Sequence, residues 1–361
     1  MAEMVKESLR AAYAGRRVLV TGDTGFKGSW LTVALMELGA VVSGFALPAE
    51  HARGHFRLAG LGSLISHRDG DLRDSDAVRS AVDAAAPEVV FHLAAQPLVR
   101  VSYEEPKRTF DTNVGGSVNV LEAVRATSAV RALVYITSDK CYRNKEWLWG
   151  YRENDELGGD DPYSASKAAA ELVLSSYQRS YFDTRSGFGA AAVRAGNVIG
   201  GGDWSAHRIV PDCIRSLLAG EAIVLRNPDS TRPWQHVLEP IFGYLLLGAR
   251  LLESPKEFSS AWNFGPRPEA TRSVRELAEE VVQHWGAGSV RIERPAQALH
   301  EAGLLQLNCD KALQLLNWQA AWSFRQAVAA TVAWYRKTSE GAPAQEVSRG
   351  QIRDYLEGPN D

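Results

Sequence analysis

The sequence predicts an α/β protein in which a doubly wound parallel sheet is accompanied by a smaller, mostly helical lobe. In the first half of the chain, short β-branched runs alternate with stretches of helical periodicity. The short runs are apolar throughout, which is typical of parallel strands that helices cover on both faces. Beyond Gly196 this alternation stops, which indicates a second lobe of different construction.

The predicted strands follow one another at intervals that leave room for a helix between them. They are RRVLVTG (16–22), AVVSGFAL (40–47), GSLISHRDGD (62–71), PEVVFHLAA (87–95), VRALVYITS (130–138) and GAAAVRAG (189–196). Amphipathic helices are expected between them, for example at 28–38 and 109–125.

The second half is expected to hold loops rich in glycine, proline and tryptophan, followed by helices. The loops are GGGDW (200–204) and NPDSTRPWQH (227–236), the helices are expected at 273–286 and 325–336, and a segment within 237–264 is expected to return to the sheet. We therefore predict a cofactor-binding domain made of residues 1–193 and about 236–265, and a substrate-binding lobe made of 194–235 and about 266–361. The tail after Glu340 is polar and is expected to be loosely held.

Charge and cysteine content exclude several classes of function. The 361 residues include 40 basic and 43 acidic side chains without a block of like charge, so neither nucleic acid nor a membrane is an expected partner. Cys141, Cys213 and Cys309 lie far apart without metal-ligand spacing, so we interpret them as packing residues and expect no metal. The first 17 residues lack the apolar stretch of a secretion signal, and a cytoplasmic location is expected.

A glycine-rich segment, VLVTGDTGFKGSW, follows the first strand and opens the first helix. Gly22, Gly25 and Gly28 let the backbone approach a pyrophosphate, and the helix N-terminus offers free N–H groups, as in the Rossmann fold. Phe26 and Lys27 belong to the same cofactor-binding loop. A simple tight turn is the alternative, because a glycine triplet alone is a weak signal.

The residues that would hold the adenosine end of a dinucleotide are less clear. The second strand ends in Phe45, Ala46 and Leu47 without an acidic residue at its tip for the ribose hydroxyls, and Glu50 lies past a proline. Since Lys27 could approach a 2′-phosphate, this loop leaves NAD and NADP both open. Asp71 and Leu72, after the third strand, are candidates for the adenine end, and Asp71 is equally well interpreted as a turn residue.

The segment PYSASK places Tyr163 and Lys167 four residues apart, and therefore on one face of a helix that Pro162 can begin. A nearby ammonium group stabilises phenolate. A free tyrosine has a pKa of about 10, so a tyrosine base near neutral pH needs a shift of roughly 3 units, which Lys167 and a nicotinamide cation together could supply. A structural role is the alternative, because this spacing is frequent by chance.

The segment ITSDKCY ends a buried strand on Ser138, Asp139 and Lys140. Charged residues are rarely buried without a partner or a chemical task. A solvated turn or a salt bridge would also explain them, and the segment alone does not decide among these interpretations.

Several motifs together are more specific than each motif alone. TGDTGFKG, GDLRD (70–74), FHLAAQ (91–96), TNVGGSVNVLEA (112–123), ITSD and YSASK occur in this order over about 200 residues, and the chain thereby resembles the extended short-chain dehydrogenase/reductase family. The resemblance implies a Rossmann fold, NAD as the cofactor and a homodimer or homotetramer. It assigns Gln96 to the substrate, and to the cofactor it assigns Leu93, Ala94, Ala95, Asn113, Tyr163 and Lys167. Asn113 could instead satisfy the backbone of a bent helix.

Within that family the chain resembles the sugar-nucleotide 4,6-dehydratases, in which Ser138 would be the partner of Tyr163. Those enzymes usually have Asp and Glu after this serine, and the Asp139–Lys140 pair found here resembles the enzymes that act on CDP-glucose, whose products supply dideoxysugars for lipopolysaccharide. Asp139 would be the acid for water loss. Lys140 would be the base at C5 if it is a neutral amine, and it could alternatively position groups or balance charge.

The resemblance also implies residues for the substrate diphosphate. It assigns Asn197, Arg208, Arg232 and His300 to substrate binding. Arg208 and Arg232 could also be plain surface charges. Two other functions stay open at this point, a sugar-nucleotide 4-epimerase and a non-catalytic NAD(P)-binding regulator.

Overall fold

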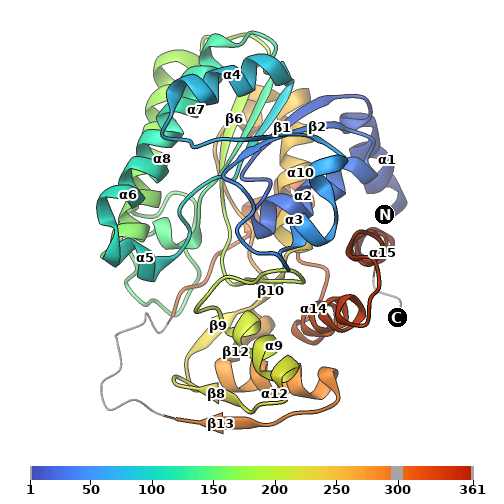
Figure 1. The fold of residues 1–361 in the computed structure, drawn as a ribbon. Coiled ribbons are helices and arrows are strands. Elements are labelled where there is room, and N and C mark those ends of the chain that lie inside the picture. Colours follow the sequence, from blue (N-terminus) through green and yellow to red (C-terminus); the bar gives the residue numbers. More distant parts are fainter. Residues whose placement is uncertain (1, 294–303, 359–361) are drawn as a thin grey trace.

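The computed structural model describes residues 2–293 and 304–358. Within these residues a seven-stranded, all-parallel sheet has the strand order β11-β6-β5-β4-β1-β2-β3 (Figure 1). The strands are β1 (Arg17–Thr21), β2 (Val41–Ala46), β3 (Ser66–Asp69), β4 (Val89–His92), β5 (Ala132–Ile136), β6 (Gly189–Arg194) and β11 (Ala261–Asn263). The doubly wound fold is confirmed, and the predicted return of the 237–264 segment to the sheet is β11 beside β6.

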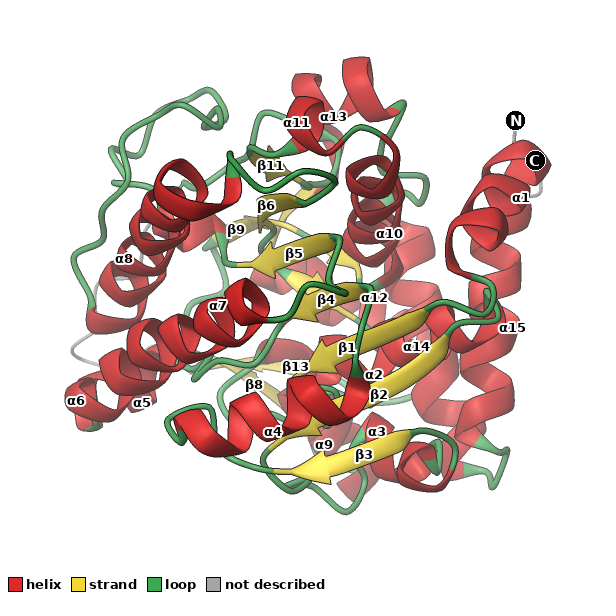
Figure 2. Ribbon diagram, turned by 90° about the horizontal axis from the view of Figure 1, so that it is seen from above, coloured by secondary structure: helices red, strands yellow, loops and turns green. Residues whose placement is uncertain are grey.

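Helices cover both faces of the sheet, as the view from above shows (Figure 2). One face carries α1 (Ala2–Tyr13), α2 (Phe26–Glu37), α3 (His55–Leu58) and α10 (Leu238–Glu253). The other face carries α4 (Ser75–Ala85), α7 (Gly116–Ala126) and α8 (Pro162–Tyr177), with α5 (Val99–Glu104) and α6 (Pro106–Phe110) beside α8. Helix α15 (Ala344–Glu357) packs on the outside of α1 and α2, and α14 (Phe324–Ser339) packs between α15 and the second lobe. None of the helices in residues 2–293 and 304–358 has the length and apolar content to cross a bilayer.

The strands are apolar on both sides because successive side chains enter different halves of the core. In β1, Val18 and Val20 pack with the α2 and α10 side, whereas Leu19 packs with the α4 and α7 side. In β5, Val134 packs with the α2 and α10 side, and Tyr135 packs with the α4 and α7 side. A side-chain period of two in a sheet with two buried faces gives the continuous apolar runs on which the prediction rested.

The second lobe lies below the carboxyl edge of the sheet in Figure 1. Among the described residues it contains α9 (Ile209–Ala219), α12 (Val274–Trp285) and the short strand pairs β7 (Val198–Ile199) with β10 (Gln235–His236), β9 (Thr231–Pro233) with β12 (Thr271–Ser273), and β8 (Ile223–Leu225) with β13 (Val290–Ile292). The predicted helix at 273–286 is α12. Its capping box joins Ser273 and Glu276, and Gly286 ends it with a positive φ of 86°.

Short elements complete the described chain. They are α11 (Pro255–Phe258), α13 (Asp310–Leu316), the π-helical turns η2 (Asp111–Gly115) and η4 (Gln178–Phe182), and the 3₁₀ turns η1 (Leu61–Ser63), η3 (Asp139–Cys141) and η5 (Pro268–Ala270). The helix predicted at 109–125 therefore consists of the end of α6, the turn η2 and α7.

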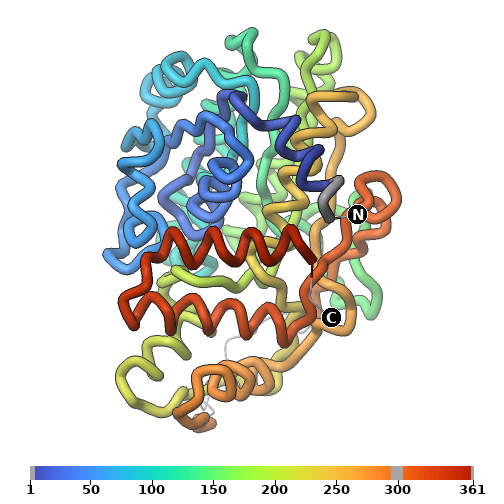
Figure 3. The backbone as a smooth tube through the Cα atoms, turned by 90° about the vertical axis from the view of Figure 1, so that its right-hand side faces the viewer, coloured from blue at the N-terminus to red at the C-terminus, as the bar shows by residue number. Residues whose placement is uncertain are grey.

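The expectation of a loosely held tail after Glu340 is wrong. Helix α15 runs alongside α14 and packs against α2 and α1 (Figure 3). Its buried stripe includes two polar residues, Ser348 and Gln351, and these interrupt the apolar pattern that would predict a packed helix. Ser348 accepts a hydrogen bond from Trp334 Nε1 at 2.9 Å and contacts His55 Nε2 at 2.8 Å. The division into a cofactor-binding domain and a substrate-binding lobe stays a prediction.

Candidate active site

The glycine loop joins β1 to α2 and rests on the loop that follows β4. Gly22 has a φ of +77°, and a Cβ atom there would lie 2.7 Å from the backbone nitrogen of Ala94. A Cβ atom on Gly28 would lie 2.0 Å from the carbonyl oxygen of Gly22. No side chain caps the N-terminus of α2 at Gly25, so its first N–H groups are available to an anion.

Gly28→Ala is expected to lower the affinity for NAD by at least about 10-fold, because the new methyl group overlaps the Gly22 carbonyl and displaces the loop. Calorimetric titration with NAD measures the change. Gly350→Ala on α15 is the matched control, because a Cβ atom there meets nothing within 4 Å. Equal NAD affinity in the two variants would contradict the role of the loop.

A buried acid in the same loop pairs with a histidine on β3, which the sequence analysis missed. His67 Nδ1 lies 2.7 Å from Asp23 Oδ2, and its Nε2 lies 3.0 Å from Asp69 Oδ1. Gly44 on β2 makes room, since a Cβ atom there would lie 2.1 Å from Asp23 Oδ2. The hydrogen bond to Asp23 raises the pKa of His67 to about 9. Burial raises the pKa of Asp23.

This pair predicts a pH dependence of stability. Since the folded-state pKa of His67 is about 9 and the unfolded value is about 6.5, the stabilisation is complete below pH 6.5 and is lost as the pH rises through about 9. The melting temperature of the protein should therefore fall toward that of His67→Gln between pH 6.5 and 9.5. The exposed His51→Gln should follow the unmodified chain at every pH. A constant difference between the His67→Gln and unmodified chains would refute the assignment.

Ser138 and Asp139 lie at the carboxyl end of β5 and are both buried. Ser138 Oγ donates to Asp139 Oδ1 at 2.9 Å and accepts from the backbone N–H of Lys140 at 3.2 Å. The Asp139 carboxylate packs on the backbone of Gly196, where a Cβ atom would lie 1.9 Å from Oδ2. Lys140 is half-buried. The turn η3 therefore presents a hydroxyl, a carboxylate and an amine in consecutive residues.

Helix α8 brings Tyr163 and Lys167 to the same place. Asp161 caps the helix by accepting from the Ser164 N–H at 2.9 Å, and Pro162 occupies its first turn. Tyr163 and Lys167 are both buried, and the Ser138 hydroxyl lies close enough to the Tyr163 phenol to lower its pKa. The predicted set of Ser138, Tyr163 and Lys167 is thus gathered at one site.

The pKa of Tyr163 is raised, whereas a tyrosine base near neutral pH needs a lowered pKa. Burial raises the pKa of Tyr163 to about 12, and the nearby Ser138 hydroxyl acts in the opposite direction. Burial and the charge of Lys27 lower the pKa of Lys167 to about 8. The polypeptide alone therefore favours the phenol, because desolvation outweighs the nearby cations, and a lowered value needs the additional positive charge of a nicotinamide.

Basic side chains surround this set. Lys27 is half-buried at the start of α2, and its pKa is lowered to about 8 by burial and by the charge of Arg208, while Asp139 opposes the shift. The charge of Arg208 also lowers the pKa of Tyr163. These interactions place Lys27, Arg208 and Lys167 around Asp139 and Tyr163, which is an environment suited to anionic phosphate groups.

Gln96 and Asn113 are joined to each other. Gln96 N–H donates to Asn113 Oδ1 at 2.8 Å, and Asn113 Nδ2 donates to the Gln96 carbonyl at 3.1 Å and to Ser166 Oγ at 2.9 Å. Asn113 lies in the π-helical turn η2, which agrees with the alternative of a polar residue in a bent helix. The predicted cofactor residues Leu93, Ala94 and Ala95 are half-buried beside this pair, after β4.

Asp71 and Leu72 lie at the other end of the predicted cofactor site. Asp71 pairs with Arg73 at 2.6 Å and accepts the Arg73 N–H at 2.9 Å, as a turn residue does. It also lines a surface cavity of about 650 Å³ together with Asn119. Leu72 is buried, and Gly116 of α7 lies so close that a Cβ atom there would be 2.7 Å from Leu72 Cβ. Both interpretations of Asp71 therefore stay open.

Three of the other predicted substrate residues, Asn197, Arg208 and Arg232, lie beyond β6. Asn197 has a positive φ of 52° between β6 and β7. Arg208 pairs with Asp203 at 3.1 Å. Arg232 lies on β9 and donates to the Thr231 carbonyl at 2.7 Å. His300 lies outside the described residues.

The chain belongs to the NAD dependent epimerase/dehydratase family, whose model matches residues 18–260. The prediction of NAD as the cofactor is thereby confirmed. The residues at hand fit NAD, because the α2 N-terminus is uncapped, the glycine loop has no room for Cβ atoms, and basic side chains lie beside the tyrosine.

Among curated relatives, the chain is 45% identical to the CDP-glucose 4,6-dehydratase of Salmonella typhimurium, over 95% of this chain and 97% of the relative. It is 28% identical to the dTDP-glucose 4,6-dehydratase of Streptomyces antibioticus, over 88% and 92% of the two chains. Among solved structures, the UDP-glucose 4-epimerase of Thermus thermophilus in complex with NAD matches with a TM-score of 0.73 and 27% identity, covering 89% of this chain and 99% of that one. The fold and the family of the chain are thus the ones predicted.

Proposed function

We propose that this protein converts CDP-glucose to CDP-4-keto-6-deoxyglucose and water, as a CDP-glucose 4,6-dehydratase. The observation that carries the proposal is the placement of the Ser138–Asp139–Lys140 turn against Tyr163. This turn supplies the additional acid and base that water loss requires and that a simple oxidation or epimerisation at C4 does not. The 45% identity to a relative of that name over nearly the whole chain supports the same substrate.

The first step would be proton removal from the sugar 4-hydroxyl. Tyr163 takes this proton, and the neighbouring Ser138 holds the same hydroxyl in place. Lys167, one turn along α8, stabilises the phenolate by its charge. NAD, when bound, supplies a hydride acceptor for C4 and returns the hydride at C6.

Water loss would then use the acid and the base of η3. The 4-ketone acidifies the C5–H bond, and Lys140 as a neutral amine takes that proton. Protonated Asp139 gives its proton to the departing 6-hydroxyl, which leaves as water. The proton held by Lys140 returns to C5, and the sugar has then lost one water. Asp139 regains a proton from Tyr163, or from solvent after Tyr163 has released its own, so the enzyme ends with the number of protons with which it began.

The diphosphate of the substrate would be held by basic groups at the lobe interface. Arg208 is the strongest candidate, because its charge acts on both Tyr163 and Lys27. Arg232 and Asn197 would contact the same group from β9 and from the start of β7.

A single assay tests the proposed function. The protein is incubated with NAD and CDP-glucose, and with UDP-, GDP- and dTDP-glucose in parallel, and the ultraviolet band of a 4-keto sugar in alkali is followed. We expect the band with CDP-glucose and at most a weak band with the others. Conversion of another nucleotide sugar alone would refute the substrate, and formation of CDP-galactose without the band would indicate a 4-epimerase. Binding without turnover would indicate a regulator.

The product would supply dideoxysugar synthesis for lipopolysaccharide in the cytoplasm. We also propose a homodimer or homotetramer, which sedimentation of the purified chain tests.

A further inference from the structure

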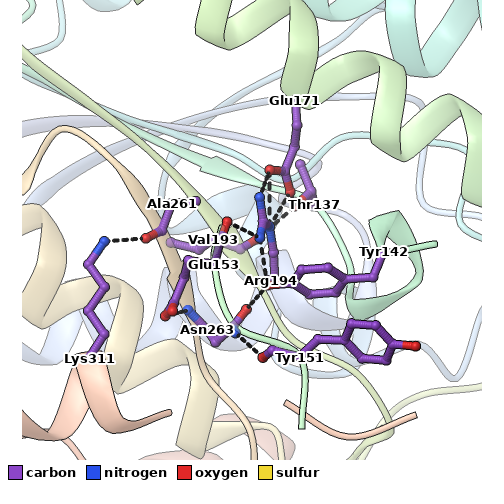
Figure 4. A network of polar contacts seen from close by, with 10 residues as sticks. All are labelled: Thr137, Tyr142, Tyr151, Glu153, Glu171, Val193, Arg194, Ala261, Asn263 and Lys311. Carbon is purple, nitrogen blue, oxygen red and sulfur yellow. Dashed lines mark hydrogen bonds and ion pairs between the residues drawn. The ribbon is translucent and has the colours of Figure 1, made fainter. Parts of the chain in front are cut away.

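Glu171 of α8 and Arg194 of β6 form a buried ion pair at the centre of a network of polar contacts (Figure 4). The side chains of Arg194 and Glu171 are only 3% and 4% exposed. Arg194 Nε donates to the two carboxylate oxygens of Glu171 at 2.8 and 3.0 Å, and Nη2 donates to Oε2 as well. Because a buried ion pair is often no more stabilising than apolar residues of the same volume, its presence calls for a role besides stability.

Glu171 joins the helix that carries the tyrosine to the strand that carries the serine. It lies on α8 four residues after Lys167 and therefore on the same helix face. Its Oε1 accepts the hydroxyl of Thr137 at 2.6 Å, and Thr137 immediately precedes Ser138. The carboxylate thus ties α8 to the end of β5.

Arg194 extends this connection to the loop between Lys140 and α8. Its Nη1 donates to Tyr142 Oη at 2.5 Å and to the Glu153 carbonyl at 3.0 Å. Tyr142 in turn donates to Asn263 Oδ1 on β11 at 2.8 Å. Arg194 ends β6, two residues before Gly196, whose backbone supports Asp139. One guanidinium group therefore contacts helix α8 and the loop that follows η3, and it ends the strand that leads to Gly196.

We propose that Glu171 and Arg194 are positioning residues that keep the hydroxyls of Ser138 and Tyr163 next to each other, acting through Thr137 and helix α8. This inference rests on the proposed roles of Ser138 and Tyr163. Both side chains are buried, so the pair acts on the reacting groups through their placement and, by the charge of Glu171, through the pKa of Lys167, which that charge raises.

The double variant Glu171→Met/Arg194→Met separates positioning from stability. Apolar replacement of both partners leaves no unpaired charge, so the melting temperature should stay within about 5 °C of the unmodified chain. Because small misplacements of reacting groups cost about 100-fold in rate, kcat for CDP-glucose should fall by about that factor while KM and the NAD affinity change less than about 3-fold. In crystal structures, the distance from Ser138 Oγ to Tyr163 Oη should be longer in the variant than in the unmodified chain by about 1 Å.

A matched pair of substitutions at Thr137 tests the link by a milder change. Thr137→Val removes the hydroxyl that Glu171 accepts and keeps the shape, whereas Thr137→Ser keeps the hydroxyl. We expect about a 10-fold loss of kcat for valine and near-normal kcat for serine. This pair decides the question even if the double variant does not fold.

Glu239→Gln serves as the control for a buried carboxylate elsewhere. Glu239 accepts the N–H groups of Ala321 and Trp322 and the hydroxyl of Tyr355. Its substitution should lower the melting temperature and leave kcat unchanged. A double variant with kcat within about 3-fold of normal and an unchanged distance between the Ser138 and Tyr163 hydroxyls would overturn the inference. If the unmodified protein does not convert CDP-glucose, the proposed function fails, and that distance in the crystal structures still tests the positioning.

Discussion

Tyr163→Phe is expected to lower kcat for CDP-glucose by about 1,000-fold, which lies within the range typical of a lost general base. The phenol is buried beside Ser138, so phenylalanine fills the same space without the group that takes the 4-hydroxyl proton. Initial rates of 4-keto sugar formation measure the loss, and NAD affinity, measured by calorimetry, should be unchanged.

Tyr181→Phe is the matched control for this substitution, since Tyr181 is 50% exposed beside Arg125 and away from the site. It should leave the rate unchanged. Retention of more than a tenth of the normal rate by Tyr163→Phe would exclude Tyr163 as the base. Loss of NAD affinity in that variant would show that the ring holds the cofactor and would leave its role as a base without support.

The sheet could be predicted because its signal is local. Strands such as β5 and β6 are buried along their whole length and read as continuous apolar runs. The edge strand β3 is shorter than the segment predicted for it, because only Ser66–Asp69 pair with β2 and three of these four residues are exposed. Helix α15 was missed because Ser348 and Gln351 interrupt its apolar stripe, and their hydrogen-bond partners lie on other helices.

The candidate site likewise contains some residues that local sequence patterns predict and others that only the fold brings together. Tyr163 and Lys167 are four residues apart, and Ser138 comes at the end of a strand, so local sequence patterns are enough to predict them as site residues. The Glu171–Arg194 pair joins residues 23 positions apart, and the Asp23–His67 pair joins residues 44 positions apart. Contacts across neighbouring strands depend on sheet order and register, which single-sequence patterns do not contain. The spacing of Glu171 from Lys167 was the one available signal.

Lys140→Met is expected to abolish exchange of the C5 hydrogen with solvent while oxidation at C4 continues. Methionine keeps most of the length of the side chain and removes the amine that would take the C5 proton. With CDP-glucose in heavy water, mass spectrometry should show at least about a 100-fold slower uptake of deuterium at C5. Transient reduction of the bound nicotinamide, followed by absorbance, should remain at its normal rate.

Two comparisons distinguish a base from a charge that merely balances Asp139. Lys145→Met removes an exposed lysine five residues away, paired with Glu156 at 3.2 Å, and should leave both rates unchanged. Lys140→Arg keeps a positive charge, but a guanidinium group does not lose a proton near neutral pH. If Lys140 is the base, arginine and methionine should be equally slow at C5. If arginine restores exchange, the amine acts only through its charge, and the proton at C5 must go to another group, of which Asp139 is the nearest along the chain.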